Sequence, residues 1–264
     1  MFIFRRVASV MACLPLIGCV SCVGNSQWVY NSVNPSSTIT ERTFVLAPFT
    51  SIDAETMVDV KISQSENQNV VLSAPSNYFQ YLEVKVINGV LTVSNPKKAN
   101  LRDVEMTLTV SVPRLSSVKS SGTGDIDFIG LFVTEDMKAI SSGTGDIEGQ
   151  IKATSLDLKS SGTGDINITA VSGLTSIYAT TTGTGDITVA GSAEKAFYKS
   201  SGTGDIKAFR MKVVDVEAYT SGTGDVECYA TGSFSGSASG MGDIEVKGNP
   251  ARRNSENKKV RFSD

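Results

Sequence analysis

The chain has 264 residues, of which 40% are hydrophobic and 19% charged, so it can bury a sizeable core and lacks the composition of a disordered chain. Its net charge of −3 argues against a basic face that holds a nucleic-acid backbone, and we expect no nucleic-acid partner. The chain contains no histidine, which excludes Ser-His-Asp and Cys-His catalysis and any zinc site built on histidine.

Residues 1–18 have the pattern of a signal peptide. Arg5 and Arg6 precede an apolar stretch over 7–17, which is too short to span a bilayer, since a spanning helix needs about 20 apolar residues. Three of the four cysteines lie at or before Cys22, so cysteine usage does not indicate a disulfide framework. We therefore expect residues 1–18 to be removed on export.

The quartet Leu16-Ile17-Gly18-Cys19 resembles the bacterial lipobox, in which the cysteine is acylated and becomes the first residue of the mature protein. The resemblance implies that Cys19 is lipidated and that residues 19–37 form a tether from the membrane to a folded domain. The alternative is an ordinary secretory signal with chance cysteines, and Cys22 is a second candidate for the acylated residue. Val20 is not the Asp that often signals inner-membrane retention, so we expect an outer-membrane lipoprotein of the cell envelope, with its periplasmic or surface side left open.

Seven copies of Gly-x-Gly-Asp-(Ile/Val) dominate the body of the chain. The motif glycines are Gly122, Gly124, Gly143, Gly145, Gly162, Gly164, Gly183, Gly185, Gly202, Gly204, Gly222, Gly224, Gly240 and Gly242. The aspartates are Asp125, Asp146, Asp165, Asp186, Asp205, Asp225 and Asp243, so their sequence numbers differ in turn by 21, 19, 21, 19, 20 and 18. Repetition at a nearly fixed period is typical of an array of equivalent structural units.

The residues on either side of each motif alternate with the period of a β-strand. Five, seven and nine residues before the Asp the side chains are mostly small or apolar, and an Ile or Val follows each Asp. A unit of about 20 residues cannot bury its apolar face alone, so we predict an all-β fold in which residues 114–248 form a parallel β-solenoid (β-helix) of about seven coils. The rival is a chain of antiparallel hairpins that turn at Thr-Gly. The solenoid predicts an aliphatic ladder of Ile126, Ile147, Ile166, Ile187, Ile206, Val226 and Ile244.

Residues 38–113 lack the motif but also have strand patterning. Val58, Val60 and Ile62 alternate, and Asn88-Gly89 separates two apolar runs as in a tight hairpin. We expect a β-rich N-terminal portion that begins or caps the solenoid. Residues 249–264 are basic and are expected either to cover the other end or to remain a solvated tail.

Together these features carry a family resemblance. The Ser-Gly-Thr-Gly-Asp-Ile repeats, the strand that ends at Val112-Pro113 with Leu115 beyond, and the 82–94 hairpin resemble the putative auto-transporter adhesin head (GIN) domain family over about 40–248. The resemblance implies a β-helical fold and an envelope location. It supplies no catalytic residues to carry over.

The repeated turn has four interpretations at this point. In the structural one, glycine permits positive φ at a corner and Asp accepts N–H bonds from its own turn. In the second, the seven aspartates form a calcium ladder, although one Asp per coil supplies few ligands for an ion that takes six to eight.

In the third, the fold is a polysaccharide-active enzyme; the acidic residues outside the motif are Glu135, Asp136, Asp157, Asp215 and Glu217. In the fourth, an outward hydroxyl ladder binds an extended glycan or peptide; its members are Ser121, Ser142, Ser161, Thr182, Ser201, Ser221 and Ser239.

The residues favour a non-catalytic binding or structural module of the cell envelope, held on the membrane by its lipid anchor. The family resemblance adds the expectation of an adhesin head. We expect no cofactor and no catalytic residue, and a glycan or protein ligand of unknown identity. Cys228 is expected to be a buried free thiol.

Overall fold

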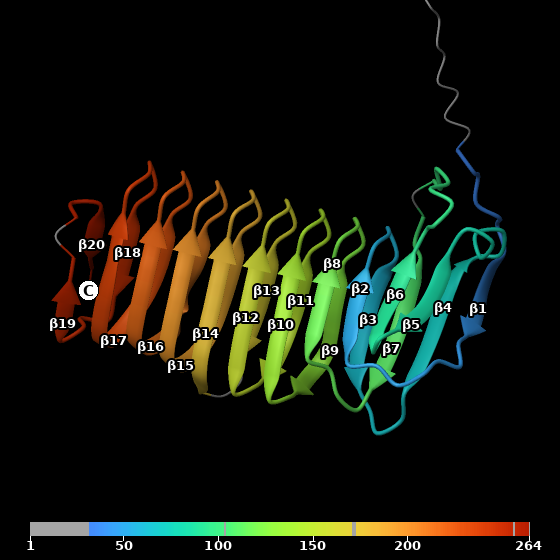
Figure 1. Ribbon diagram of the computed structural model, residues 1–264, viewed down its shortest axis with the longest axis horizontal. Helices are drawn as coiled ribbons and strands as arrows, with labels where there is room; N and C mark the ends of the chain where they lie inside the picture. Colours follow the sequence, from blue (N-terminus) through green and yellow to red (C-terminus); the bar gives the residue numbers. More distant parts are fainter. Residues whose placement is uncertain (1–31, 103, 171–172, 256, 264) are drawn as a thin grey trace, which may run out of the picture. The chain divides into compact units, whose positions relative to one another are not determined.

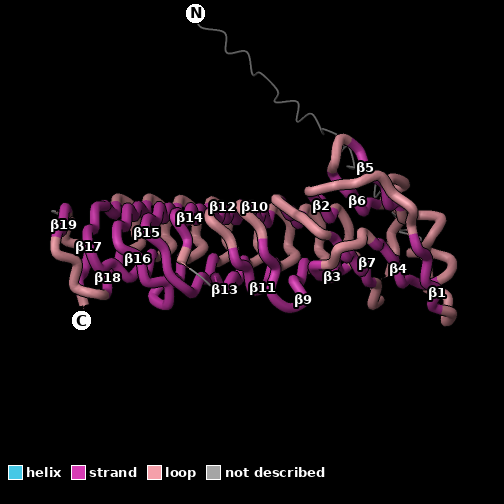
Figure 2. The backbone as a smooth tube through the Cα atoms, turned by 90° about the horizontal axis from the view of Figure 1, so that it is seen from below, coloured by secondary structure: helices cyan, strands magenta, loops and turns pink. Residues whose placement is uncertain are grey.

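The computed structural model describes residues 32–102, 104–170, 173–255 and 257–263. All the regular secondary structure assigned in these ranges is β-strand. The strands stack in coils, and each repeated coil contributes one strand segment to each of two faces (Figures 1 and 2). The Gly-x-Gly-Asp turns project as a regular row along one edge, where the strands of the first face end (Figure 1). The predicted all-β solenoid of about seven coils is confirmed.

The first face consists of the strand segments that precede the turns. They are β2 (Ser51–Ala54), β8 (Ser117–Ser120), β10 (Asp136–Ser141), β12 (Ser155–Ser160), β14 (Leu174–Thr181), the second halves of β15 (Ile187–Ser200), β16 (Ile206–Thr220) and β17 (Val226–Ala238), and β19 (Arg252–Asn254). Neighbouring segments are parallel, with equivalent residues of successive coils side by side.

The second face consists of the segments that follow the turns. They are β3 (Asp59–Gln64), β7 (Thr107–Val112), β9 (Ile126–Val133), β11 (Ile147–Lys152), β13 (Ile166–Ala170), the first halves of β15, β16 and β17, β18 (Ile244–Lys247) and β20 (Val260–Phe262). These segments are also parallel and in register apart from local bulges. The antiparallel hairpin arrangement is therefore wrong for the repeats.

The core between the two faces is built from the predicted ladder. Each ladder residue pairs with its equivalent in the next coil, as Ile147 does with Ile126 and Ile166, and all seven are fully buried. Val60 extends the ladder at one end and Val260 at the other. The alternation of buried and exposed residues along each strand is thus the direct cause of the two-faced stack.

The N-terminal end closes the stack with antiparallel strands. β4 (Asn69–Pro75) pairs with β7, and β1 (Ile39–Thr43) pairs with β4. β5 (Glu83–Ile87) and β6 (Val90–Ser94) form the predicted hairpin, in which Asn88 and Gly89 both have positive φ, as a type I′ turn requires. β2 and β3 continue the solenoid, because they pair in parallel with β8 and β9.

The basic C-terminal segment forms another partial coil. β19 pairs with β17, and β20 pairs with β18. The ring of Phe262 packs edge-on against Phe234 with centroids 5.5 Å apart, and the guanidinium of Arg253 lies 4.5 Å from the Phe262 ring centroid. These contacts agree with the expectation that this segment covers the end of the stack, and not with a solvated tail.

Candidate functional site

The repeated turns are glycine-rich because successive coils approach closely. A Cβ atom on the first glycine of a turn would lie 1.9–2.1 Å from a carbonyl oxygen of the preceding coil, and one on the second glycine 2.0–2.3 Å away. None of the fourteen motif glycines has positive φ. The expectation that glycine serves a left-handed corner is therefore wrong. The turns are hydrogen-bonded to one another, as Thr163 N–H is to Gly143 O at 2.9 Å, and a side chain would separate them.

The small residue five positions before each Asp holds the turn from inside. In six coils it is a buried Ser or Thr whose hydroxyl donates to the carbonyl of the second glycine of the same turn, at 2.7–3.2 Å. These residues are Ser120, Ser141, Ser160, Thr181, Ser200 and Thr220. The last coil has Ala238 at this position. Each of these buried hydroxyls thus has a partner, as buried polar groups generally require.

The aspartates form a ladder between coils. Oδ1 of each Asp accepts the backbone N–H of the Asp in the next coil, at 2.7–3.0 Å, from Asp59 through Asp225. The expected bond to the Asp's own turn is thus replaced by a bond to the neighbouring coil. Asp59, which precedes the first motif, begins this ladder, so the solenoid includes a turn that the glycine motif does not mark.

The second carboxylate oxygen has a cationic partner in two coils. Lys207 Nζ lies 2.5 Å from Asp186 Oδ2, and Arg261 pairs with Asp243. Beside the ladder, desolvation and then the charges of Asp125 and Asp59 raise the pKa of Asp127, against the opposing charge of Lys61. Within the described ranges no three Asp, Glu or Cys side chains gather closely enough to hold a metal ion. The fold thus brings the predicted aspartates together in a hydrogen-bonded column.

The predicted outward hydroxyls do form a line, four residues before each Asp. Ser121 is half-buried, and the remaining six are exposed. The Thr between the two motif glycines is also exposed in six coils, and Met241, 76% exposed, replaces it in the seventh. The turn edge is therefore a narrow crest of hydroxyls above the aspartate ladder.

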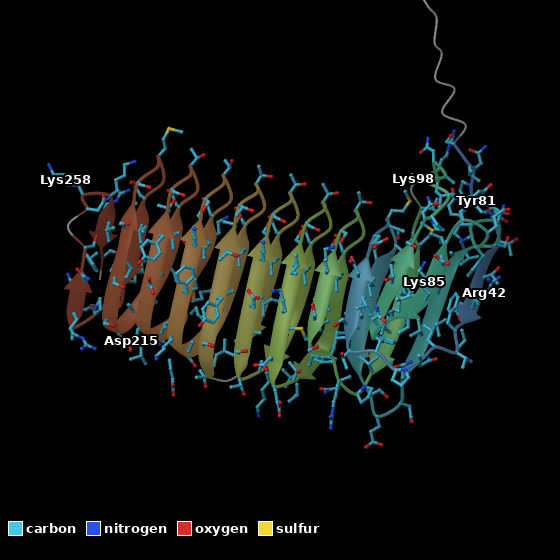
Figure 3. All side chains as sticks on the ribbon, viewed as in Figure 1. Arg42, Tyr81, Lys85, Lys98, Asp215 and Lys258 are labelled. Carbon is cyan, nitrogen blue, oxygen red and sulfur yellow. The ribbon has the colours of Figure 1, made fainter. Side chains whose placement is uncertain are left out.

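The acidic residues considered for an enzyme do not form one cluster. Asp157 pairs with Lys138 at 2.9 Å, Asp215 (Figure 3) accepts a bond from Ser233, and Glu217 accepts one from Tyr219. Glu135 and Asp136 line a separate hollow of about 580 Å³.

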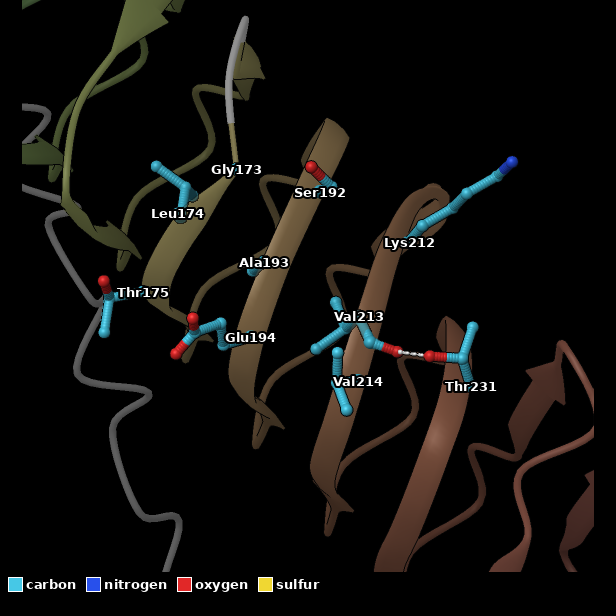
Figure 4. A pocket seen from close by; sticks show the side chains of 10 residues that line it. All are labelled: Gly173, Leu174, Thr175, Ser192, Ala193, Glu194, Lys212, Val213, Val214 and Thr231. Atoms are coloured by element: carbon cyan, nitrogen blue, oxygen red, sulfur yellow. Dashed lines mark hydrogen bonds between the residues drawn. The ribbon is translucent and has the colours of Figure 1, made fainter.

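Another hollow, of about 400 Å³, is lined by residues where the chain passes from the second face to the first in neighbouring coils (Figure 4). Its walls include Leu174, Val213 and Val214, with Glu194 and Lys212 as its two charged groups. The ammonium group of Lys212 points away from Glu194 in Figure 4. The two groups are therefore not arranged as an acid and base around one reacting atom.

Three aromatic side chains on the first face lie outside the repeated motif. Tyr178 is 51% exposed, and the rings of Phe197 and Tyr219 are half-buried. The ring centroids are 6.3 Å apart between Tyr178 and Phe197 and 5.9 Å apart between Phe197 and Tyr219. We call these three residues the aromatic strip. A comparison of outward positions between coils would have found them, because equivalent positions elsewhere are mostly polar.

Cys228 and Tyr198 are titratable groups buried in the core of the repeats. Burial raises the pKa of Cys228 to about 12, and the thiol is free and fully buried. Burial, and then nearby Cys228, raises the pKa of Tyr198. The Tyr198 hydroxyl has no hydrogen-bond partner among the described residues. Both groups stay neutral at ordinary pH, which suits a packing role.

The proposed lipidation site lies outside the described residues, as do Cys22 and the whole signal sequence. None of the residues that the structure describes forms a helix with the length and apolar character needed to cross a bilayer.

Comparisons with known proteins agree with this architecture. The family model described as "Putative auto-transporter adhesin, head GIN domain" matches residues 48–250. A crystal structure of a putative adhesin from Bacteroides fragilis is 25% identical, covers 88% of this chain and 96% of its own, and has a TM-score of 0.66. A putative adhesin from Parabacteroides distasonis is 21% identical, with coverage of 88% and 99% and a TM-score of 0.80. A putative lipid binding protein from the same species is 20% identical, with coverage of 88% and 100% and a TM-score of 0.79. No curated protein matches the sequence.

Proposed function

The chain belongs to the family of the head GIN domain of putative auto-transporter adhesins, and from that premise we propose that it is a lipid-anchored, non-catalytic adhesin head. The family indicates a location at the cell envelope or surface. The Cys19 lipobox in the sequence supports a membrane anchor at the N-terminal end, which would leave the solenoid outside the cytoplasm.

One observation carries the non-catalytic part of the proposal: the repeated polar groups are used by the fold. Each Asp Oδ1 from Asp59 to Asp225 accepts a backbone bond, and the buried hydroxyls hold the turns. What remains for a partner is the outward surface of a stack whose coils are hydrogen-bonded throughout. Such a surface suits recognition of an extended ligand by repeated contacts.

The same observation bears on calcium. From Asp59 to Asp225 each Oδ1 already accepts a backbone N–H, and Oδ2 of Asp186 and of Asp243 is paired with a cationic side chain. Ca²⁺ takes six to eight oxygen ligands. A binding module whose partner is a macromolecule therefore fits the geometry better than a calcium array.

Protease treatment of intact cells tests the proposed location. A surface adhesin should be cleaved in intact cells, whereas a periplasmic module should be cleaved only after the outer membrane is permeabilised. Protection in intact cells would overturn the adhesin role.

Metabolic labelling with a fatty-acid analogue tests the anchor. Label should be lost from Cys19→Ser and retained by the matched control Cys22→Ser, because the lipobox ends at Cys19. Retention of label by Cys19→Ser would contradict the assigned anchor residue.

A further inference from the structure

The aromatic strip departs from the repeat at positions where the fold does not need a ring. Eight residues before the turn Asp, the first face has Ser117, Lys138 and Asp157 in the coils before Tyr178, and Glu217 and Ser235 in the coils after Phe197. Serine, lysine and carboxylate side chains thus occupy the backbone position of Tyr178 and Phe197 in other coils. Tyr219 lies six residues before its Asp, where the neighbouring coils have Lys199 and Ser237. The rings therefore need a reason other than coil formation.

The rings lie across three neighbouring strands, β14, β15 and β16. Tyr178 pairs in register with Phe197. Tyr219 lies diagonal to Phe197, because its register partner on β15 is Lys199. The planes are inclined by 37° and 47°, so the strip is a row of tilted rings whose outermost member exposes half of its surface. Exposed aromatic groups that sit together commonly mark recognition surfaces.

Unpaired lysines flank the strip. Lys195 and Lys199 lie two residues before and after Phe197 on the same strand face, about 7 Å away along the strand. Lys159 pairs in register with Thr180, two residues beyond Tyr178. All three lysines are exposed, and none forms an ion pair with a residue that the structure describes.

Three carboxylates near the strip each have a side-chain partner, and one of them is neutralised by an ion pair. Asp157 is paired with Lys138 at 2.9 Å, the Tyr219 hydroxyl donates to Glu217 at 2.6 Å, and the Ser233 hydroxyl donates to Asp215 at 2.5 Å. Asp215 and Glu217 keep their negative charges and lie in register with Lys195 and Phe197, so the three lysines exceed these two carboxylates by one positive charge. An anionic partner would be repelled by the aspartate ladder and would meet an excess of positive charge around the aromatic strip.

We propose that the aromatic strip and its three lysines form a binding site for an acidic glycan, a polysaccharide that bears carboxylate or sulfate groups. This inference rests on the proposed adhesin function and names its ligand class. The ring faces would stack on the C–H faces of sugar rings, while Lys159, Lys195 and Lys199 pair with the anionic substituents. The rings follow one another from coil to coil, which suits a chain that lies along the stack.

A peptide ligand is less well matched to this surface. Extended peptides commonly bind by adding a strand to a free sheet edge, but β14, β15 and β16 are each paired on both sides over these residues. The strip therefore offers side-chain contacts but no free strand edge, and a glycan can bind through side-chain contacts alone.

The test measures binding of the purified full chain, in detergent, to immobilised polygalacturonate and heparin, with dextran as the neutral glycan. We expect binding to at least one acidic glycan, weaker binding at raised salt, and no binding to dextran. Tyr178→Ser should weaken binding about tenfold while the circular dichroism spectrum is unchanged. No binding to either acidic glycan, or equal binding to dextran, would overturn the inference.

A charge-matched pair of triple variants separates the site from general electrostatics. Replacing Lys159, Lys195 and Lys199 by Gln should weaken binding at least about tenfold. The control replaces Lys98, Lys152 and Lys258 by Gln, which changes the net charge equally and should weaken binding less than about twofold. Equal losses in both variants would contradict the site.

Two further probes decide the class of ligand. Polyglutamate or single-stranded DNA that binds as tightly as the acidic glycan, with the same loss in Tyr178→Ser, would overturn the glycan assignment, since both are anionic and DNA bases also stack on rings. Failure of the two proposals is distinguishable. A chain cleaved by protease on intact cells that binds no acidic glycan refutes only this inference, while a chain protected on intact cells refutes the adhesin role.

Discussion

Replacing Asp146 separates the two properties of the aspartate ladder, its acceptor oxygen and its charge. Asp146 Oδ1 accepts the N–H of Asp165 at 2.7 Å, and the Asp146 N–H donates to Asp125 at 2.8 Å. Asparagine keeps an acceptor oxygen and removes the charge, whereas alanine removes both. If the ladder is a structural hydrogen-bonded column, asparagine should be tolerated and alanine should not.

The expected magnitudes follow from the spacing of the coils. Unit charges about 4.8 Å apart repel by about 1 kcal/mol in a water-like dielectric, so Asp146→Asn relieves up to about 2 kcal/mol from its two neighbours before screening by salt. A charge-assisted hydrogen bond is about twice as strong as a neutral one, so the substitution also gives up about 1 kcal/mol. We expect Asp146→Asn to lie within about 1 kcal/mol of the parent and Asp146→Ala to be about 1–2 kcal/mol less stable than Asp146→Asn.

Urea denaturation followed by circular dichroism, at low and raised salt, measures these differences. Salt should stabilise the parent more than Asp146→Asn, because salt screens the repulsion that the variant lacks. Asp157, whose side chain is 45% exposed and paired with Lys138, is the matched control, and its Asn and Ala variants should both change stability by less than about 1 kcal/mol. If Asp146→Asn is as damaging as Asp146→Ala, the charge itself is needed. That result would refute the structural explanation and direct attention to a bound cation.

Three further substitutions test the turns and the core. Gly164→Ala should destabilise by about 3 kcal/mol, because its Cβ would lie 2.1 Å from Gly145 O and would force the coils apart, as urea midpoints would report. Tyr198→Phe should stabilise by about 1 kcal/mol in the same assay, because the buried hydroxyl has no partner among the described residues. The folded pKa of Cys228 is raised to about 12 from 9.0, so its contribution to stability is present below pH 9 and is lost as pH rises through 12. Cys228→Ala should therefore lose stability less steeply over that range, by up to about 1.4 kcal/mol per pH unit.

Each of these has a contrary outcome. Gly173→Ala is the control for the turn, since its Cβ would meet its nearest atom, Ser192 Oγ, at 3.5 Å. Equal effects of Gly164→Ala and Gly173→Ala would refute the close-approach explanation. A clear loss of stability in Tyr198→Phe would mean that the hydroxyl is satisfied in solution, and a parallel alkaline decline in Cys228→Ala would mean that other groups cause it.

The solenoid could be predicted because one periodic cause acts in every coil. Alternation identified the inward residues, the nearly constant interval between motifs set the coil, and the ladder from Ile126 to Ile244 followed from both. The Asn88-Gly89 hairpin was predictable for a local reason, since both residues accept positive φ. These features depend on short-range patterns that the sequence displays directly.

The turn at Asp59 was missed because it lacks glycine, and the stack explains why. A Cβ on a motif glycine points at the preceding coil, so Gly122 would clash with Thr56 O and Gly124 with Val58 O. The turn at 56–59 comes before the first such contact, and side chains are tolerated at Thr56 and Val58. Only an Asp followed by Val60 remained as a signal. The direction of the Asp bond was equally hidden, because its donor belongs to the neighbouring coil.

Uniform and variable positions of this repeat therefore have different meanings. A residue type that recurs from coil to coil satisfies the same stacking contacts each time, as the motif Gly and Asp and the six buried hydroxyls do. A ligand that binds one part of the stack and not another must instead be recognised by outward residues that vary between coils. Tyr178, Phe197 and Tyr219, with unpaired lysines around them, are the clearest departure of that kind. The same reasoning predicts that transplanting these outward residues onto the equivalent positions of earlier coils would move the glycan site without altering the fold.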